Sequence, residues 1–172
     1  TIKTNYELLR DKELYNYSIE SCLHILEVDT KDLNDTYNYV IKNYGQELLN
    51  KNTSILRVPV ARIEAVEEKL KGLISEQTLL GACITNRTIE EMVEIVRICK
   101  KENVKETSTI FKQPPEEVRE IIRICQIYNI EITGSLFHKN SDALKEIINY
   151  CVSNNISIER SLFSCKRKEL DS

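Results

Sequence analysis

The chain has 172 residues, of which 41% are hydrophobic and 30% charged, and its formal net charge is −3. This composition excludes a disordered chain, and 4 glycines and 3 prolines are too few for an all-β fold with many turns. The acidic balance argues against a protein that coats a phosphate backbone, and the absence of a run of about eighteen apolar residues argues against a membrane span.

Residues 1–61 are predicted to form a helical cap at the amino end. Apolar residues at helical spacing predict helices over about 5–26 and 30–50, and we expect a loop over Asn50–Pro59. The segment keeps only traces of the 26-residue period described next. It is therefore either a separate cap or a set of degenerate repeats.

Residues 62–165 repeat with a period of 26. A shift of 26 positions aligns cysteine with cysteine, asparagine with asparagine and phenylalanine with phenylalanine, without a gap. We predict an all-α fold: an α-solenoid of four 26-residue long-helix/short-helix repeats with an amino-terminal helical cap and a polar tail at 166–172, in one continuous domain. The blocks are 62–87, 88–113, 114–139 and 140–165, and the aligned residues are Cys99, Cys125 and Cys151; Asn103, Asn129 and Asn155; and Phe111, Phe137 and Phe163.

Each block is predicted to hold a long helix followed by a short one. Apolar residues from Met92 to Cys99 lie at the spacing of one helix face, and the other blocks repeat this pattern. Thr88 and Glu91 predict a capping box, and Pro114-Pro115 suits a first helical turn. The aligned asparagines predict left-handed helix ends. The short segments, α or 3₁₀, are expected at about 105–111, 131–137 and 157–163.

The first block departs from the pattern. Thr85 replaces the phenylalanine, Gln77 the asparagine and Leu73 the cysteine. A terminal unit of a repeat array has one neighbour instead of two, so we expect it to be atypical.

The cysteines and histidines suggest a metal or catalytic hypothesis that their spacing does not support. Structural zinc sites use cysteine pairs about two to four residues apart, and this chain has none. We interpret the aligned cysteines as small buried thiols. His24, near Cys22, is interpreted as a partly buried structural side chain. Since no glycine-rich phosphate loop is present either, we expect no catalytic residue, cofactor or metal, and no enzyme activity.

Acidic residues occupy two aligned columns, four residues apart, which lie on the same side of each long helix. Stacked units would set these eight carboxylates side by side as an acidic ridge, while Lys71, Arg97 and Arg123 can pair with the second column within a helix. The ridge is either a solvated outer face or a binding surface for a basic partner. It consists of Glu64, Glu68, Glu90, Glu94, Glu116, Glu120, Asp142 and Glu146.

The short segments are predicted to line the inner, concave side of the array. Their polar residues differ between copies, as expected for either a binding surface or an unconstrained one. This candidate concave surface consists of Lys105, Lys112, Glu131, His138, Lys139 and Arg160.

These patterns predict a non-enzymatic helical-repeat binding module, foremost a protein–protein interaction scaffold, because solenoids present extended surfaces and this chain is acidic. The alternative is a repeat-based DNA- or RNA-binding regulator. The order of long helix, turn and short helix resembles that of the αα-repeat families, including mitochondrial transcription terminators and pentatricopeptide proteins, which bind nucleic acid. Their units are longer than 26 residues, and the resemblance identifies no site residue.

The sequence also suggests a location. The amino end lacks the apolar stretch of a signal peptide, and the 6 cysteines have no paired short spacings. We therefore expect a cytoplasmic protein with free thiols. The chain begins with Thr1, as expected of a fragment or a processed product.

Overall fold

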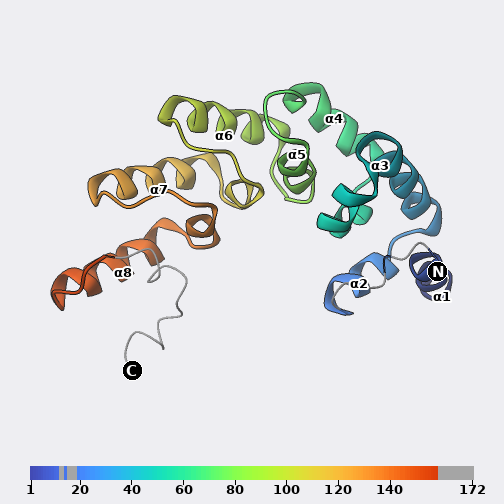
Figure 1. Cartoon of the computed structure of the whole chain (residues 1–172), viewed down its shortest axis with the longest axis horizontal. Helices are drawn as coiled ribbons and strands as arrows, with labels where there is room; N and C mark the ends of the chain where they lie inside the picture. The colour runs from blue at the N-terminus through green and yellow to red at the C-terminus, as the bar shows by residue number, and fades with distance from the viewer. Residues whose placement is uncertain (12–13, 15–18, 159–172) are drawn as a thin grey trace. The chain divides into compact units, whose positions relative to one another are not determined.

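The computed structural model describes residues 1–11, 14 and 19–158, except for the side chains of 19–22, and in these ranges the chain is helical with no β-strand (Figure 1). The chain divides into two compact units, Thr1–Asn86 and Arg87–Ser172. The boundary falls at the junction of the first and second predicted blocks, so the first block belongs with the amino-terminal helices. None of the helices in the described ranges is long and apolar enough to cross a membrane.

The unit Thr1–Asn86 does not contain the single helix predicted over 5–26. The Nδ2 atom of Asn5 lies 3.0 Å from the carbonyl oxygen of Leu26, whereas a continuous helix would separate these residues by roughly 30 Å. The predicted loop over Asn50–Pro59 contains a 3₁₀ helix. The elements are α1 (Ile2–Asp11), α2 (Ile19–Leu26), α3 (Thr30–Lys51), η2 (Thr53–Arg57), α4 (Val60–Leu70) and α5 (Glu76–Cys83).

Helix α3 bends at Gly45, whose φ of 83° and ψ of 170° lie outside the helical region and suit a residue without a side chain. Two residues that precede the bend contact α4. The hydroxyl of Tyr39 donates to Oε2 of Glu67 at 2.8 Å, and the hydroxyl of Tyr44 donates to the other oxygen of the same carboxylate. Burial and this carboxylate raise the pKa of both tyrosines. Glu67 therefore joins the part of α3 before the bend to α4.

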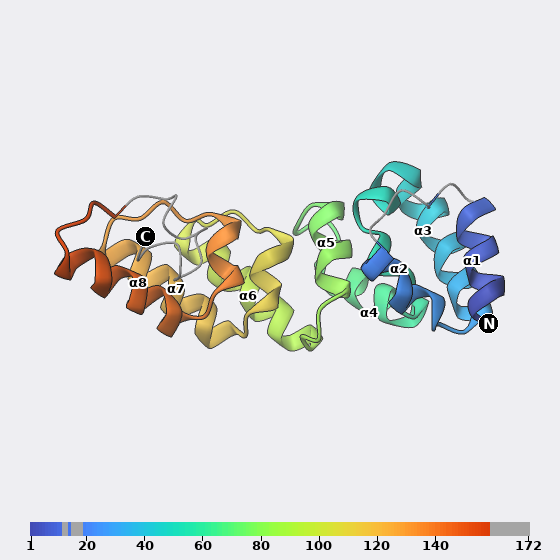
Figure 2. The ribbon, with the colours of Figure 1, turned by 90° about the horizontal axis from the view of Figure 1, so that it is seen from below.

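The unit Arg87–Ser172 is more regular. Its long helices lie side by side, and the 3₁₀ helices that follow the first two contact each other (Figures 1 and 2). The short segments predicted in the second and third blocks are thus 3₁₀ helices, and the one predicted over 157–163 lies outside the described residues from 159 onward. The elements are α6 (Ile89–Glu102), η3 (Ser108–Lys112), α7 (Pro115–Ile127), η4 (Gly134–His138) and α8 (Ser141–Ser153).

The helix ends confirm the predicted signals. Thr88 and Glu91 form a capping box, and Pro114 and Pro115 occupy the N-cap and the first position of α7. The asparagines after the long helices have φ of 54°, 53° and 53°. In each case the next N–H donates to the carbonyl of the aligned cysteine at 2.8 Å, which closes the helix in a Schellman motif. The pairs are Val104 with Cys99, Ile130 with Cys125, and Ile156 with Cys151.

The aligned apolar residues form the core of this unit. Phe111 and Phe137 are buried, as are Cys99, Cys125 and Cys151, whereas Phe163 lies outside the described residues. Burial raises the pKa of the Cys99 thiol to about 12 and that of Cys125 to about 11. The interpretation of the aligned cysteines as buried free thiols is confirmed.

Side chains link η3 to η4 as well. The hydroxyl of Thr109 donates to the carbonyl of Gly134 at 2.8 Å. The side-chain amide of Gln113 donates to the carbonyls of Phe137 at 3.0 Å and Lys139 at 3.2 Å. A Cβ atom on Gly134 would lie 2.8 Å from Oγ1 of Thr109, so the close approach requires glycine.

The first block is atypical, as expected of a terminal unit. Its second segment is the α-helix α5 instead of a 3₁₀ helix, and it begins earlier in the block. Leu73, which replaces the aligned cysteine, is 47% exposed. It follows Gly72, which has a φ of 80° and ends the turn after α4.

Candidate functional site

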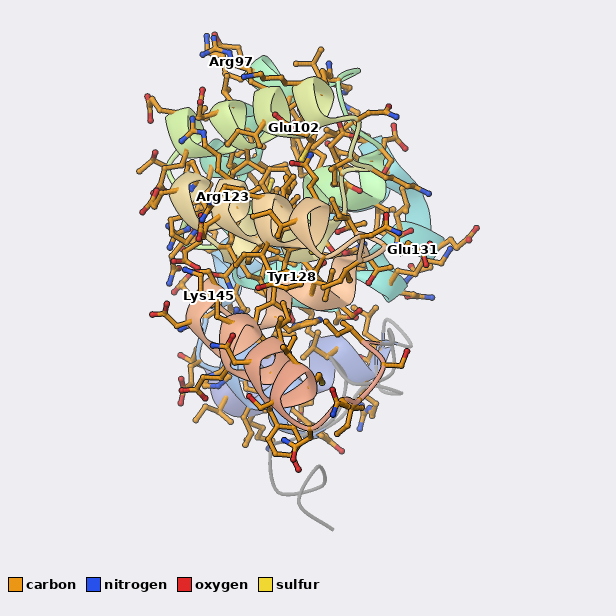
Figure 3. All side chains as sticks on the ribbon, turned by 90° about the vertical axis from the view of Figure 1, so that its left-hand side faces the viewer. Arg97, Glu102, Arg123, Tyr128, Glu131 and Lys145 are labelled. Carbon is orange, nitrogen blue, oxygen red and sulfur yellow. The ribbon has the colours of Figure 1, made fainter. Side chains whose placement is uncertain are left out.

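The exposed face of α6, α7 and α8 bears the charged residues that the sequence singled out. In Figure 3, Arg97, Arg123 and Lys145 follow one another along one edge of the three helices, whereas Glu131 lies at the opposite edge. These three basic residues and Glu131 therefore lie on different sides of this unit.

The structure brings together six of the eight ridge residues, two on each of α6, α7 and α8. Glu64 and Glu68 lie on α4, in the other unit, where both are exposed and Glu68 forms an ion pair with Lys69 at 2.9 Å. The ridge within the unit Arg87–Ser172 thus consists of two rows, which differ in their surroundings.

The first row consists of Glu90, Glu116 and Asp142, which we call the carboxylate row. These side chains are exposed in the first turns of their helices, where negative charge is favourable. None of them forms an ion pair within 4.0 Å in the described part of the chain. The row therefore presents negative charge to solvent.

The second row consists of Glu94, Glu120 and the exposed Glu146, and basic side chains pair with the first two. Glu94 contacts Arg97 at 3.6 Å and also Arg119 on the next helix. Glu120 contacts Arg123 at 2.9 Å and Lys145 on the next helix at 2.9 Å. Hydrogen bonds from these two cations lower the pKa of Glu120 to about 2.

Sequence reasoning foresaw Arg97 and Arg123 but missed Arg119 and Lys145. It also predicted Lys71 as the partner of Glu68, which pairs with Lys69 instead. The signal for Arg119 and Lys145 is their position, 25 residues after Glu94 and Glu120, one residue short of the period. Because Glu94 and Glu120 are paired in this way, they contribute less to the negative potential of the face than the carboxylate row does.

A groove between α7 and α8, with a volume of about 240 Å³, lies on the same helices. Ile127, 61% exposed, and Tyr128, 42% exposed, line it at the end of α7, and Arg123 and Lys145 border it (Figure 3). We call it the α7/α8 groove. Sequence reasoning missed it, although Ile127 and Tyr128 align with the polar Lys101 and Glu102 of the preceding block.

The candidate concave residues lie on and beside η3 and η4. Lys105, Lys112, Glu131 and His138 are exposed, Lys139 is half-buried, and Arg160 lies outside the described residues. A pocket of about 360 Å³ is lined by Lys105 but by none of the other candidates. Neither this pocket nor the α7/α8 groove gathers these residues together.

The expectation for His24 is wrong, because this side chain is exposed. It lies between apolar residues in Cys22–Leu26, and this pattern suggested burial for His24 as well. In the structure Ile25 is buried. Among the described residues, no three His, Cys, Asp or Glu side chains come together to hold a metal ion. The chain matches no protein-family model, no curated protein and no solved structure.

Proposed function

We propose that the chain is a non-enzymatic helical-repeat binding module that acts as a protein–protein interaction scaffold. In this proposal its four 26-residue blocks stack as an α-solenoid behind the amino-terminal cap. Support comes from the left-handed asparagines, buried cysteines and buried phenylalanines that recur at this spacing. The free thiols suit a reducing, cytoplasmic location.

The observation that carries the proposal is the α7/α8 groove. Large apolar side chains that are exposed beside a groove, in a surface that is otherwise charged, are typical of protein-binding sites. Ile127 and Tyr128 fit this description. They would receive an apolar side chain of the partner.

The carboxylate row indicates a second property of the partner, its charge. Glu116 and Ile127 lie on the same helix, eleven positions apart, which corresponds to roughly 16 Å along its axis. We expect a partner segment with an apolar anchor and, at about this distance, basic side chains. Opposite charges steer association and set its orientation.

The nucleic-acid alternative has weaker support. Arg119, Arg123 and Lys145 each contact a carboxylate of the second row. A phosphate backbone would have to displace these carboxylates before it could use the cations. Nucleic-acid binding is therefore the competing outcome of the test.

The test begins with selection of peptides by the full chain from a displayed random library. The recovered peptide is then titrated by fluorescence anisotropy. Ile127→Ser should weaken its binding about tenfold or more. The triple variant Glu90→Gln, Glu116→Gln, Asp142→Asn should slow association and flatten its salt dependence.

The control is Ile2→Ser, which removes an equally exposed isoleucine (60%) from α1 and should leave peptide binding unchanged. Undiminished binding to Ile127→Ser would exclude the groove as the site. Tight binding of duplex DNA or of RNA at physiological salt, with steep salt dependence, would favour the nucleic-acid alternative over the scaffold.

A further inference from the structure

The unit Thr1–Asn86 contains a pocket that the proposed function does not use. It has a volume of about 610 Å³ and lies where α2, the end of η2, the first turn of α4 and the end of α5 meet. Its polar lining residues are His24, Arg57, Arg62, Cys83, Thr85 and Asn86.

The pocket is lined by two guanidinium groups and an imidazole, and no carboxylate of a described residue lines it. Arg57 and His24 are exposed, and no carboxylate of the described residues lies within 4.0 Å of Arg57. In a chain with 27 acidic and 24 basic residues, this is a local surplus of positive charge. Such a surface attracts anions.

Arg62 is oriented by backbone acceptors. Its Nε donates to the carbonyl of Cys83 at 2.9 Å and its Nη2 to the carbonyl of Thr85 at 2.7 Å. These bonds join the first turn of α4 to the end of α5 and fix the plane of the guanidinium group. The Cys83 side chain adds no negative charge, because burial raises the pKa of its thiol to about 12.

Helix α4 begins at the same place. Its N-cap residue, Pro59, lines the pocket and provides no side-chain hydrogen bond to the first turn. The partial positive charge of this helix end adds to that of Arg57 and Arg62.

We propose that this pocket binds a phosphate monoester, presented as a phosphoserine or phosphothreonine side chain of a peptide. The guanidinium group of the exposed Arg57 can pair with phosphate through two parallel hydrogen bonds, and the charge of Arg62 adds to the attraction of a dianion. The pocket has the volume of roughly 20 water molecules, which exceeds what a phosphate group needs. Val58, Pro59 and Ile84 offer an apolar wall to the neighbouring peptide residues. This site and the α7/α8 groove are independent, so that either can fail alone.

The experiment uses the full chain and two oriented peptide libraries, identical except for phosphoserine or serine at the fixed position. By fluorescence anisotropy, we expect the phosphoserine library to bind at least about tenfold more tightly. Inorganic phosphate should compete with it. Amide NMR signals of residues 57–62 and 83–86 should shift on binding. Equal affinity for the two libraries overturns the proposal.

Arg57→Gln is the decisive variant, because Arg57 is exposed and its removal breaks no ion pair among the described residues. It should weaken phosphoserine binding about tenfold without changing the melting temperature, and Arg57→Lys should recover part of the loss. Arg10→Gln removes the same charge from α1, outside the pocket, and should leave binding unchanged.

Two results would overturn the proposal at this stage. Full affinity in Arg57→Gln would show that the pocket does not hold the phosphate. An equal loss in Arg10→Gln would show general attraction by charge. Preferential binding of an oligonucleotide, with the same dependence on Arg57, would replace the phosphopeptide by a nucleic-acid phosphate.

Discussion

Both compact units of the chain are helical, but their polar contacts follow different patterns. In the unit Arg87–Ser172, contacts between neighbouring helices recur at almost constant sequence spacing: Thr109 bonds to Gly134, Glu94 to Arg119 and Glu120 to Lys145. In the unit Thr1–Asn86 the corresponding separations vary from 21 to 28 residues. The constant spacing can be detected when the sequence is aligned with itself. The variable spacing cannot, because no second segment of the chain repeats it.

Asn5 illustrates the second pattern. It is fully buried, its Nδ2 donates to the carbonyls of Leu26 and Val28, and its Oδ1 accepts from the hydroxyl of Thr30. One side chain thus fixes α1 against the turn that joins α2 to α3. In the unit Arg87–Ser172, several aligned residues make the contacts that hold neighbouring helices together.

The largest effect is expected from the core of the regular unit. Phe137 is 1% exposed and belongs to an interior block, so Phe137→Ala should lower the free energy of unfolding by about 3–5 kcal/mol. Denaturant unfolding followed by circular dichroism measures this loss. Phe111→Ala should cost a similar amount if the two blocks are equivalent. A loss below about 1 kcal/mol in either would break the equivalence.

The irregular unit should depend on single polar residues. Asn5→Ala leaves two carbonyls and the Thr30 hydroxyl without their partner, and we expect it to cost about 3 kcal/mol. Asn43→Ala is the matched control, because the exposed Asn43 makes a single bond to the carbonyl of Tyr39 in its own helix. Equal melting temperatures of the two variants would argue that Asn5 does not hold α1 in place.

A smaller loss of stability is expected when Gly134 or Gly72 is replaced, and the cause differs between the two positions. In Gly134→Ala the new Cβ would meet Oγ1 of Thr109 at 2.8 Å and Oγ1 of Thr107 at 2.9 Å. This crowding should cost about 1–3 kcal/mol and separate η3 from η4. Gly72→Ala has nothing within 4 Å of the new atom and a φ of +80°, so it should cost about 1 kcal/mol through backbone strain alone. Thermal unfolding compares the two variants, and a smaller loss in Gly134→Ala would refute the close contact.

The smallest effect concerns the ion pairs of the second row. The folded-state pKa of Glu120 is about 2, below its unfolded value of about 4.3. The stabilisation is therefore fully present above about pH 4.3 and is lost as the pH falls through about 2. A side-chain NMR titration should find Glu120 still ionised at about pH 3. Lys145→Met should raise the pKa of Glu120 and Lys42→Met should not, and an unchanged titration in the first variant would disprove the ion pair across the helices.

This comparison explains which parts of the fold could be predicted from the sequence. The all-helical class, the capping box at Thr88 and the left-handed asparagines depend on local chemistry and were predicted correctly. The break between α1 and α2 was not, because it depends on a contact between Asn5 and residues more than twenty positions away.

The candidate site was predicted in part for the same reason. Aligned columns placed Glu90, Glu116 and Asp142 on neighbouring helices, which the structure shows. The α7/α8 groove depends on Ile127 and Tyr128, where one block departs from its neighbours. Alignment of repeats reveals what they share and obscures what is peculiar to one of them. Whether either surface binds a partner stays a prediction.

The spacing of the contacts between neighbouring helices has a consequence for the length of the array. Thr109 to Gly134, Glu94 to Arg119 and Glu120 to Lys145 each bridge 25 residues. Duplication or loss of one whole block of 26 residues would leave every such partner at its present distance along the chain, whereas an insertion of another length would displace the partners it separates. These contacts therefore tolerate the gain or loss of whole blocks. The surface is not fixed by the spacing in the same way, since the third block carries the exposed Ile127 and Tyr128 where the second has Lys101 and Glu102.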